Sequence, residues 1–434
     1  MTALRTALRA RAASPTVPAV VIAQLMNGRR RWAVGCASVI ALGALGLGCD
    51  GGKQGAGAEP AKSGNHAASE WKIGAYLSLS GEDAAFGIYT KEGIELAVDE
   101  INKAGGVKGK PLKVLYEDDK SNPQEATNKV LQLIDRDKVV ALLGEVASAR
   151  SKAGGIIANR KKVPMITPSS TNPDVTKVGP FVFRVCFTDD IQAQSGAEFI
   201  VSKLGKKRVG LLFASDDLYS SGLADDFRKE LKKRGGELTS EKGFLKKETN
   251  FTTYLNEIKD SKPDIIYAPI YYNQMTLIAR QGKAAGIKGD MFLGGDGWDA
   301  NEILSDAGEE LEGAYFTNFY APDVPWPNSQ AFRAAYTTRF KHDPSSLAAM
   351  GYDAAKVLAD AIKRAKDDSP DSIRQAIQET KDFAGATGNI TIDGERNADK
   401  PVVVVQIKGK KFTYFSTVHD KPGSASPAPV PEKK

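Results

Sequence analysis

The chain has 434 residues, which exceeds one ordinary domain, and its 41% hydrophobic and 26% charged residues are typical of a soluble globular protein. The formal net charge is +6, and residues 1–48 hold six arginines and no acidic residue. The remainder of the chain is therefore neutral, which removes the electrostatic case for binding nucleic acid. The positive charge belongs to the amino-terminal segment.

That amino-terminal segment has the features of an export signal. Three arginines at 29–31 precede an uncharged, mostly apolar stretch that ends in small residues before Cys49. The pattern predicts a signal peptide over residues 1–48, and Met26 is an alternative start. The run Leu45-Gly46-Leu47-Gly48-Cys49 resembles a bacterial lipobox, which predicts acylation of Cys49. Such an anchor tethers a protein to a membrane without spanning it.

Two further segments have the composition of flexible chain. Residues 49–70 are rich in Gly, Ala, Ser and Lys, and residues 419–434 are rich in proline. We expect a flexible linker in the first segment and a disordered tail in the second.

Cysteine and histidine usage argues against a disulfide or a metal site. Cys36 lies in the segment expected to be removed and Cys49 is the expected acylation site, so Cys186 has no internal partner. Its apolar surroundings in the sequence predict a buried, inert thiol. The three histidines are His66, His342 and His419. They lack the spacing of a metal site, so neither a metal nor a cofactor is predicted.

From Trp71 onward, strand patterns alternate with helix patterns. Strands are predicted at 72–79, 111–117, 139–143, 163–166, 209–214, 265–270 and 291–294, helices at 329–340, 352–365 and 370–379, and a hairpin at 402–407 and 411–415. Ile94, Ala97, Val98 and Ile101 share one helix face, and Asn122-Pro123 begins another helix. This order predicts a doubly wound α/β architecture with parallel sheets.

Open parallel sheets bind ligands beyond the carboxyl ends of their strands. The residues that follow the predicted strands include Ser148, Ser169, Thr171, Tyr219, Tyr271 and Asp296. In isolation these residues are compatible with helix caps, half-buried aromatic rings and a turn acid. Together, and with no lysine or arginine among them, they suit a zwitterionic amino acid, which needs hydroxyls and amides for its carboxylate and an acid for its ammonium.

Several sequence segments match a known family in order and spacing. They include Leu79-Ser80-Gly81, Gly93-Ile94-Glu95-Leu96-Ala97, Ile101-Asn102-Lys103-Ala104-Gly105-Gly106-Val107, Met165-Ile166-Thr167-Pro168-Ser169-Ser170-Thr171 and Gly294-Gly295-Asp296-Gly297-Trp298. From Trp71 to about Phe415 the chain resembles the type I periplasmic solute-binding proteins of ABC importers, in the branched-chain amino acid (leucine/isoleucine/valine) group. The resemblance implies two doubly wound, Rossmann-like lobes joined by three crossovers. Lobe 1 would comprise 71–188 plus 318–400, and lobe 2 would comprise 189–317 plus 401–418.

The resemblance also implies roles for individual residues. Ser148 and its backbone amide would hold the ligand carboxylate. The ammonium would bind the Ser169 carbonyl, Thr171 and, as counter-ion, Asp296. Phe86, Tyr219 and Tyr271 would line the pocket. The chain departs from the group's usual glutamate at Asp296, from its usual tyrosine at Phe86, and from its disulfide in the first lobe.

The main rival to a binding protein is an enzyme. An enzyme that binds a dinucleotide needs G-x-G-x-x-G after the first strand, where this chain has Ser78-Leu79-Ser80-Gly81. There is also no P-loop, and no histidine is placed to activate a serine, so no catalytic residue is predicted.

A ligand sensor for a membrane receptor, or a binder of short amides or urea-like compounds, remains an alternative. We expect an extracytoplasmic monomer, on the periplasmic or cell-surface side, that hands an amino acid to an ABC permease and ATPase.

The lipobox yields a direct test. Cys49→Ser should abolish acylation and release the protein from the membrane, because only a cysteine thiol at this site accepts the lipid. Labelling with a radioactive fatty acid, followed by membrane fractionation, measures both effects. Cys36→Ser, in the segment expected to be removed, is the matched control and should remain acylated. An acylated, membrane-bound Cys49→Ser protein would contradict the lipoprotein hypothesis.

Overall fold

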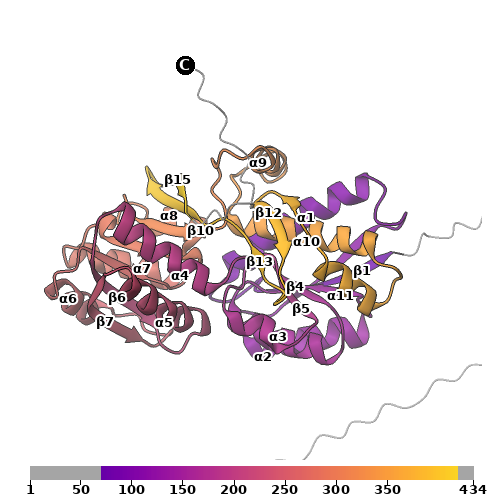
Figure 1. The fold of residues 1–434 in the computed structure, drawn as a ribbon, viewed down its shortest axis with the longest axis horizontal. Coiled ribbons are helices and arrows are strands. Elements are labelled where there is room, and N and C mark those ends of the chain that lie inside the picture. The colour runs from indigo at the N-terminus through magenta and orange to yellow at the C-terminus, as the bar shows by residue number, and fades with distance from the viewer. Residues whose placement is uncertain (1–69, 419–434) are drawn as a thin grey trace, which may run out of the picture. The chain divides into compact units, whose positions relative to one another are not determined.

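The structure is a computed structural model that describes residues 70–418 (Figure 1). The predicted signal peptide, Cys49, nearly all of the predicted linker and the predicted tail lie outside these residues. Among the described residues, no helix has both the length and the apolar character needed to cross a membrane.

Strands and helices alternate through most of the described chain. The strands are β1 Trp71–Leu77, β2 Leu112–Asp118, β3 Ala141–Leu143, β4 Met165–Thr167, β5 Val182–Arg184, β6 Arg208–Ala214, β7 Glu237–Phe244, β8 Ile265–Ala268, β9 Phe292–Gly294, β10 Tyr315–Asn318, β11 Phe383–Gly385, β12 Gly388–Ile392, β13 Ala398–Asp399, β14 Val403–Lys408 and β15 Lys411–Thr417. The helices are α1 Ala84–Lys103, α2 Pro123–Leu131, α3 Ser148–Arg160, α4 Asp189–Glu198, α5 Leu218–Lys233, α6 Thr252–Asp260, α7 Tyr272–Ala284, α8 Asn301–Ala307, α9 Pro327–Phe340, α10 Ser346–Arg364 and α11 Pro370–Gln378. Short helical turns are η1 Gln132–Arg136, η2 Pro173–Val178, η3 Phe199–Lys203, η4 Gly289–Met291 and η5 Asp296–Trp298.

The first sheet has five parallel strands in the order β2-β1-β3-β4-β5. Strands β3, β4 and β5 are buried along their whole length, as expected of strands covered by helices on both faces. The predicted helix start after β2 is confirmed, because the Asn122 side chain accepts hydrogen bonds from the backbone N–H groups of Gln124 and Glu125. Figure 1 shows α1, α2, α3, α10 and α11 grouped around this sheet.

The second sheet has seven strands in the order β15-β14-β10-β9-β8-β6-β7. Strands β6 to β10 pair in parallel with their neighbours, whereas β14 pairs antiparallel with both β10 and β15. The predicted carboxy-terminal hairpin is therefore present and extends this sheet. Strands β5, β7 and β10 and the small sheet β11-β12-β13 were not predicted from the sequence.

The chain passes between the two large sheets three times. It leaves the first sheet after β5, returns after β10 to form α9 to α11, and leaves again after β13 to form β14. This is the predicted fold, with two doubly wound halves joined by three crossovers. The exact lobe limits at 188/189, 317/318 and 400/401 stay a prediction.

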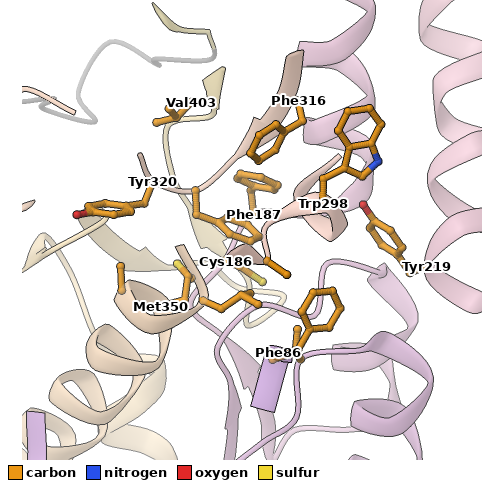
Figure 2. Close-up of a cluster of buried hydrophobic side chains, with 14 of the residues drawn as sticks. Phe86, Cys186, Phe187, Tyr219, Trp298, Phe316, Tyr320, Met350 and Val403 are labelled. Atoms are coloured by element: carbon orange, nitrogen blue, oxygen red, sulfur yellow. The ribbon is translucent and has the colours of Figure 1, made fainter. Parts of the chain in front are cut away.

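The buried core is continuous through the crossovers. Figure 2 shows Phe86 of α1 in the same cluster as Phe187 after β5, Phe316 of β10 and Val403 of β14. Cys186 belongs to this cluster, and burial raises the pKa of its thiol to about 12. The prediction that this thiol is buried is thus confirmed.

Helices α1 and α10 pack closely because glycines occupy their contact. A Cβ atom on Gly93 would overlap the carbonyl oxygen of Ala348, and one on Gly351 would overlap the carbonyl oxygen of Thr90. Both obstacles are backbone atoms, which cannot rotate away as a flexible side chain can.

We therefore expect Gly93→Ala to lower the free energy of unfolding, by about 1–3 kcal/mol, the usual effect of overpacking. Urea denaturation measures this change. Gly394→Ala is the matched control, since a Cβ atom there meets nothing within 4 Å, and it should be nearly neutral. Equal stability of the two variants would contradict the close packing of α1 on α10.

Candidate functional site

All seven residues predicted for the site line one small cavity. Phe86, Ser148, Ser169 and Thr171 come from elements around the first sheet, and Tyr219, Tyr271 and Asp296 come from elements around the second. None of the seven is more than 6% exposed. The cavity is thus enclosed in this conformation, with its wall divided between the two halves of the fold.

Sheet topology explains this convergence. In the first sheet the strand order reverses between β1 and β3, and in the second it reverses between β6 and β8. Loops that leave neighbouring strands in opposite directions open a crevice at such a point, beyond the carboxyl ends of the strands. The segments after β1, β3 and β4 meet the segments after β6, β8 and β9 at this crevice.

Aromatic rings form one wall of the cavity. Tyr219 and Tyr271 are stacked, with ring centroids 5.1 Å apart, and Phe86 meets Tyr271 edge to face at 5.3 Å. Phe86 also contacts the ring of Tyr272 at 5.2 Å, so a ring from the first half touches two from the second. This wall offers apolar faces to a bound molecule.

The single acid in the cavity wall is Asp296, at the start of the turn after β9. The Tyr219 hydroxyl donates a hydrogen bond to Asp296 Oδ1 (3.0 Å) and accepts one from the backbone N–H of Gly297 (3.2 Å). Burial raises the pKa of Asp296 to about 7, although hydrogen bonds from Gln192 and Tyr219 oppose this shift. The carboxyl group therefore lacks the cation that would keep it fully ionised.

Hydroxyl groups from the first half face the same space. The Ser169 Oγ and Thr171 Oγ1 atoms are buried and have no hydrogen-bond partner within residues 70–418. Ser148 is the first residue of α3, and its Oγ accepts a hydrogen bond from the Asn172 N–H (3.3 Å), which leaves its own proton available. Free donors at a helix amino terminus suit an anionic group.

Three further residues complete the cavity wall: Val146, Gly297 and Leu347. Val146 and Gly297 lie within two residues of predicted site residues. Leu347 belongs to α10, more than 50 residues beyond the nearest predicted site residue. A survey of strand ends cannot find it, because it reaches the cavity from a helix after the second crossover.

A second buried acid, Asp189, lies next to the hydroxyl groups. Its backbone N–H donates to the Thr171 carbonyl (3.1 Å), and neither of its carboxylate oxygens has a hydrogen-bond partner among the described residues. Burial raises its pKa well above the usual range. Sequence reasoning missed this residue because it begins α4, in a crossover, and does not follow a strand.

A charged network lies behind the cavity on the side of the first sheet. Arg150 Nη1 contacts Asp83 Oδ2 (2.8 Å), and Arg150 Nε contacts Glu145 Oε2 (3.1 Å), with all three side chains nearly inaccessible. Ser78 Oγ donates to Asp119 (2.8 Å), and burial together with the Glu145 charge raises the pKa of Asp119 to about 8. The ends of the predicted strands did not identify Arg150, which lies in the first turn of α3.

The arrangement is that of a binding pocket. Within residues 70–418, no group of three or more His, Cys, Asp or Glu side chains could hold a metal ion. The unpaired polar atoms instead supply donors on one side of the cavity and an acid on the other, at the edge of an aromatic wall. Such a set recognises a small molecule by its charges and its apolar surface.

Known proteins of similar sequence and structure are binding proteins. A family model described as periplasmic binding protein matches residues 70–411. The solved leucine-binding protein LivK of Thermotoga maritima is 37% identical, with a TM-score of 0.76 over 80% of this chain and 98% of that chain. The branched-chain amino acid binding protein LivJ of Streptococcus pneumoniae, solved in complex with isoleucine, is 31% identical, with a TM-score of 0.76 over 81% of this chain and 100% of that chain.

A curated relative gives the same indication. The leucine-, isoleucine-, valine-, threonine- and alanine-binding protein of Pseudomonas aeruginosa is 29% identical over 329 residues, which are 75% of this chain and 87% of that protein. These relatives are substrate-binding proteins and not enzymes. The chain therefore belongs to the periplasmic binding protein family, in the branched-chain amino acid group of its type I members.

Proposed function

We propose that the chain binds a small, neutral L-amino acid in the cavity between its two halves, with leucine, isoleucine and valine as first candidates. One observation carries this proposal: the buried Asp296 lacks a cation, and unpaired hydroxyls face it across an aromatic-walled cavity.

Each part of such a ligand has a counterpart in the cavity wall. The ammonium would bind Asp296 and the Thr171 hydroxyl, together with the Ser169 carbonyl. The carboxylate would accept hydrogen bonds from Ser148 and the first amides of α3. The side chain would pack against Phe86 and the stacked tyrosines, and the absence of a cation from the cavity wall itself disfavours an acidic side chain.

Binding requires the two halves to move. The lining residues are almost inaccessible, so a ligand reaches them only if the halves separate about the three crossovers and close again. Membership of the family implies an extracytoplasmic location. There the protein would act as a monomer, tethered through Cys49, and pass its ligand to an ABC permease and ATPase.

The zwitterion assignment is tested by titrating leucine, leucinamide and the corresponding α-keto acid side by side. Leucine should bind at least about a hundredfold more tightly than either analogue, because each analogue leaves one set of buried polar groups unpaired. Isothermal titration calorimetry gives all three affinities. If leucinamide or the keto acid equals leucine, the zwitterion assignment is wrong, and tight binding of short amides would favour the amide-binder alternative.

Asp296→Asn tests the ammonium contact. At pH 8 we expect leucine affinity to fall by about 2–5 kcal/mol, the usual loss when a buried charge pair loses one partner. Below pH 7 the wild-type affinity should weaken by up to about tenfold per pH unit, since a protonated Asp296 must release its proton to bind an ammonium. The variant should lack this dependence. Asp290→Asn, at an exposed position, is the control and should keep wild-type affinity.

The same substitution should not lower the stability of the ligand-free protein at pH 8. The pKa of Asp296 is raised from 3.8 to about 7, so the fold favours the protonated acid. That contribution is complete below pH 3.8 and is lost as the pH rises through about 7. Asparagine resembles the protonated acid, so its melting temperature at pH 8 should equal or exceed that of the wild type. Near-normal leucine affinity would mean that Asp296 is only a turn residue.

A further inference from the structure

Lys246 belongs to the second half of the fold and is held there by its backbone. It lies two residues after β7, and its N–H donates to Asp216 Oδ1 (2.6 Å) in the loop after β6. Its carbonyl accepts a hydrogen bond from Gln274 Nε2 (3.2 Å) in α7. The base of the side chain therefore moves with the second sheet.

The ammonium group of Lys246 nevertheless reaches the first half. It lies 2.8 Å from Glu82 Oε1 and 3.3 Å from Asp83 Oδ2, in the loop between β1 and α1. That loop is fixed to the first half, because the Asp83 N–H donates to Ser121 Oγ (3.1 Å) and Arg150 Nη1 donates to Asp83 Oδ2 (2.8 Å). The ion pairs of Lys246 thus cross from one half to the other.

Two neighbours reinforce this crossing point. The Tyr272 hydroxyl donates to the Glu82 carbonyl (3.1 Å), and Asn273 Nδ2 lies 3.3 Å from Asp83 Oδ1. Both residues directly follow Tyr271, whose ring centre lies 5.3 Å from the Lys246 ammonium. The crossing point therefore adjoins the aromatic wall of the cavity.

The charges around Lys246 allow its ion pairs to form and to break. Asp83 is fully buried, but it is shared between Lys246 and Arg150, which lies on its own side. When the halves separate, Arg150 still neutralises Asp83, so no buried carboxylate is left unpaired. The Lys246 side chain is 18% exposed when paired, and it can return to water. Both the open and the closed arrangement are then electrostatically acceptable.

We propose that Lys246 is a positioning residue of the binding site: its ion pairs with Glu82 and Asp83 hold the cavity closed, and its ammonium holds Tyr271 in the cavity wall. This inference rests on the proposed function, because closure matters only if the cavity holds a ligand. Loss of these ion pairs favours the open arrangement and speeds release of the ligand.

Zero-length cross-linking tests the contact without depending on a ligand. A water-soluble carbodiimide activates a carboxylate and leaves as a urea when an adjacent amine forms the amide. In the full chain, with and without 1 mM leucine, mass spectrometry should find Lys246 joined to Glu82. Lys161 and Asp135, 2.8 Å apart within the first half, are the positive control. If only the control pair is joined in both samples, the proposal is overturned.

Release kinetics test the consequence of the contact. Lys246→Met removes the charge but keeps most of the unbranched side chain, and it should raise the leucine dissociation rate about tenfold, since losing one partner of a partly buried pair acts mainly on dissociation. Lys247→Met is the matched control, because Lys247 is exposed and forms no ion pair with another described residue, and it should behave as wild type. Lys246→Arg should restore slow release. Stopped-flow tyrosine fluorescence measures these rates.

A double-mutant cycle separates closure from a general loss of structure. Glu82→Gln should speed release as Lys246→Met does, and the double variant should be no faster than the faster single variant. Melting temperatures should stay close to wild type. Additive effects, or a Lys246→Met protein with unchanged release, would overturn the proposal. If the Lys246–Glu82 cross-link forms but leucine does not bind, the leucine assignment fails and the contact between the halves stands.

Discussion

Burial of the Asp296 carboxyl group in the cavity determines the charge that a ligand must bring. The Tyr219 hydrogen bond (3.0 Å) is a neutral one, and no lysine or arginine of residues 70–418 forms an ion pair with this acid. Burial therefore raises its pKa to about 7. The ammonium of the proposed ligand would restore the ionised form, because an opposite charge in a low-dielectric space favours ionisation.

The topology explains why this selection is linked to motion. Hydroxyl donors come from loops of the first half, whereas the acid and two of the three rings come from the second. The first half offers polar groups to both ends of the proposed zwitterion, but the acid that would balance its ammonium belongs to the second half. A ligand held by the first half alone would keep an ammonium without a counter-ion until closure brings Asp296 to it. Binding free energy is therefore available to drive the halves together, as population shift requires.

Sequence patterns predicted the architecture, because parallel strands are buried runs. The ends of the predicted strands identified six of the ten residues that line the cavity, because ligands bind where such strands end, and the family resemblance added Phe86. Prediction failed where the pattern was weak. Strand β7 lies at a sheet edge with mostly polar, half-exposed residues, and the strands of the small sheet have two to five residues. Leu347, Asp189 and Lys246 reach the site from a helix, a crossover and a loop, so their positions depend on tertiary packing that no local pattern encodes.

Four buried acids illustrate two situations, which differ in whether a cation contacts the carboxylate. Asp83 and Glu145 contact Arg150 at 2.8 Å and 3.1 Å, so both acids have a cationic partner within the first half. Asp296 and Asp189 have no such cation, and burial raises the pKa of both. Unpaired buried acids oppose folding at neutral pH and are expected where function requires them. Asp83 and Glu145 are therefore part of the scaffold, whereas Asp296, in the cavity wall, would gain its cation from the proposed ligand.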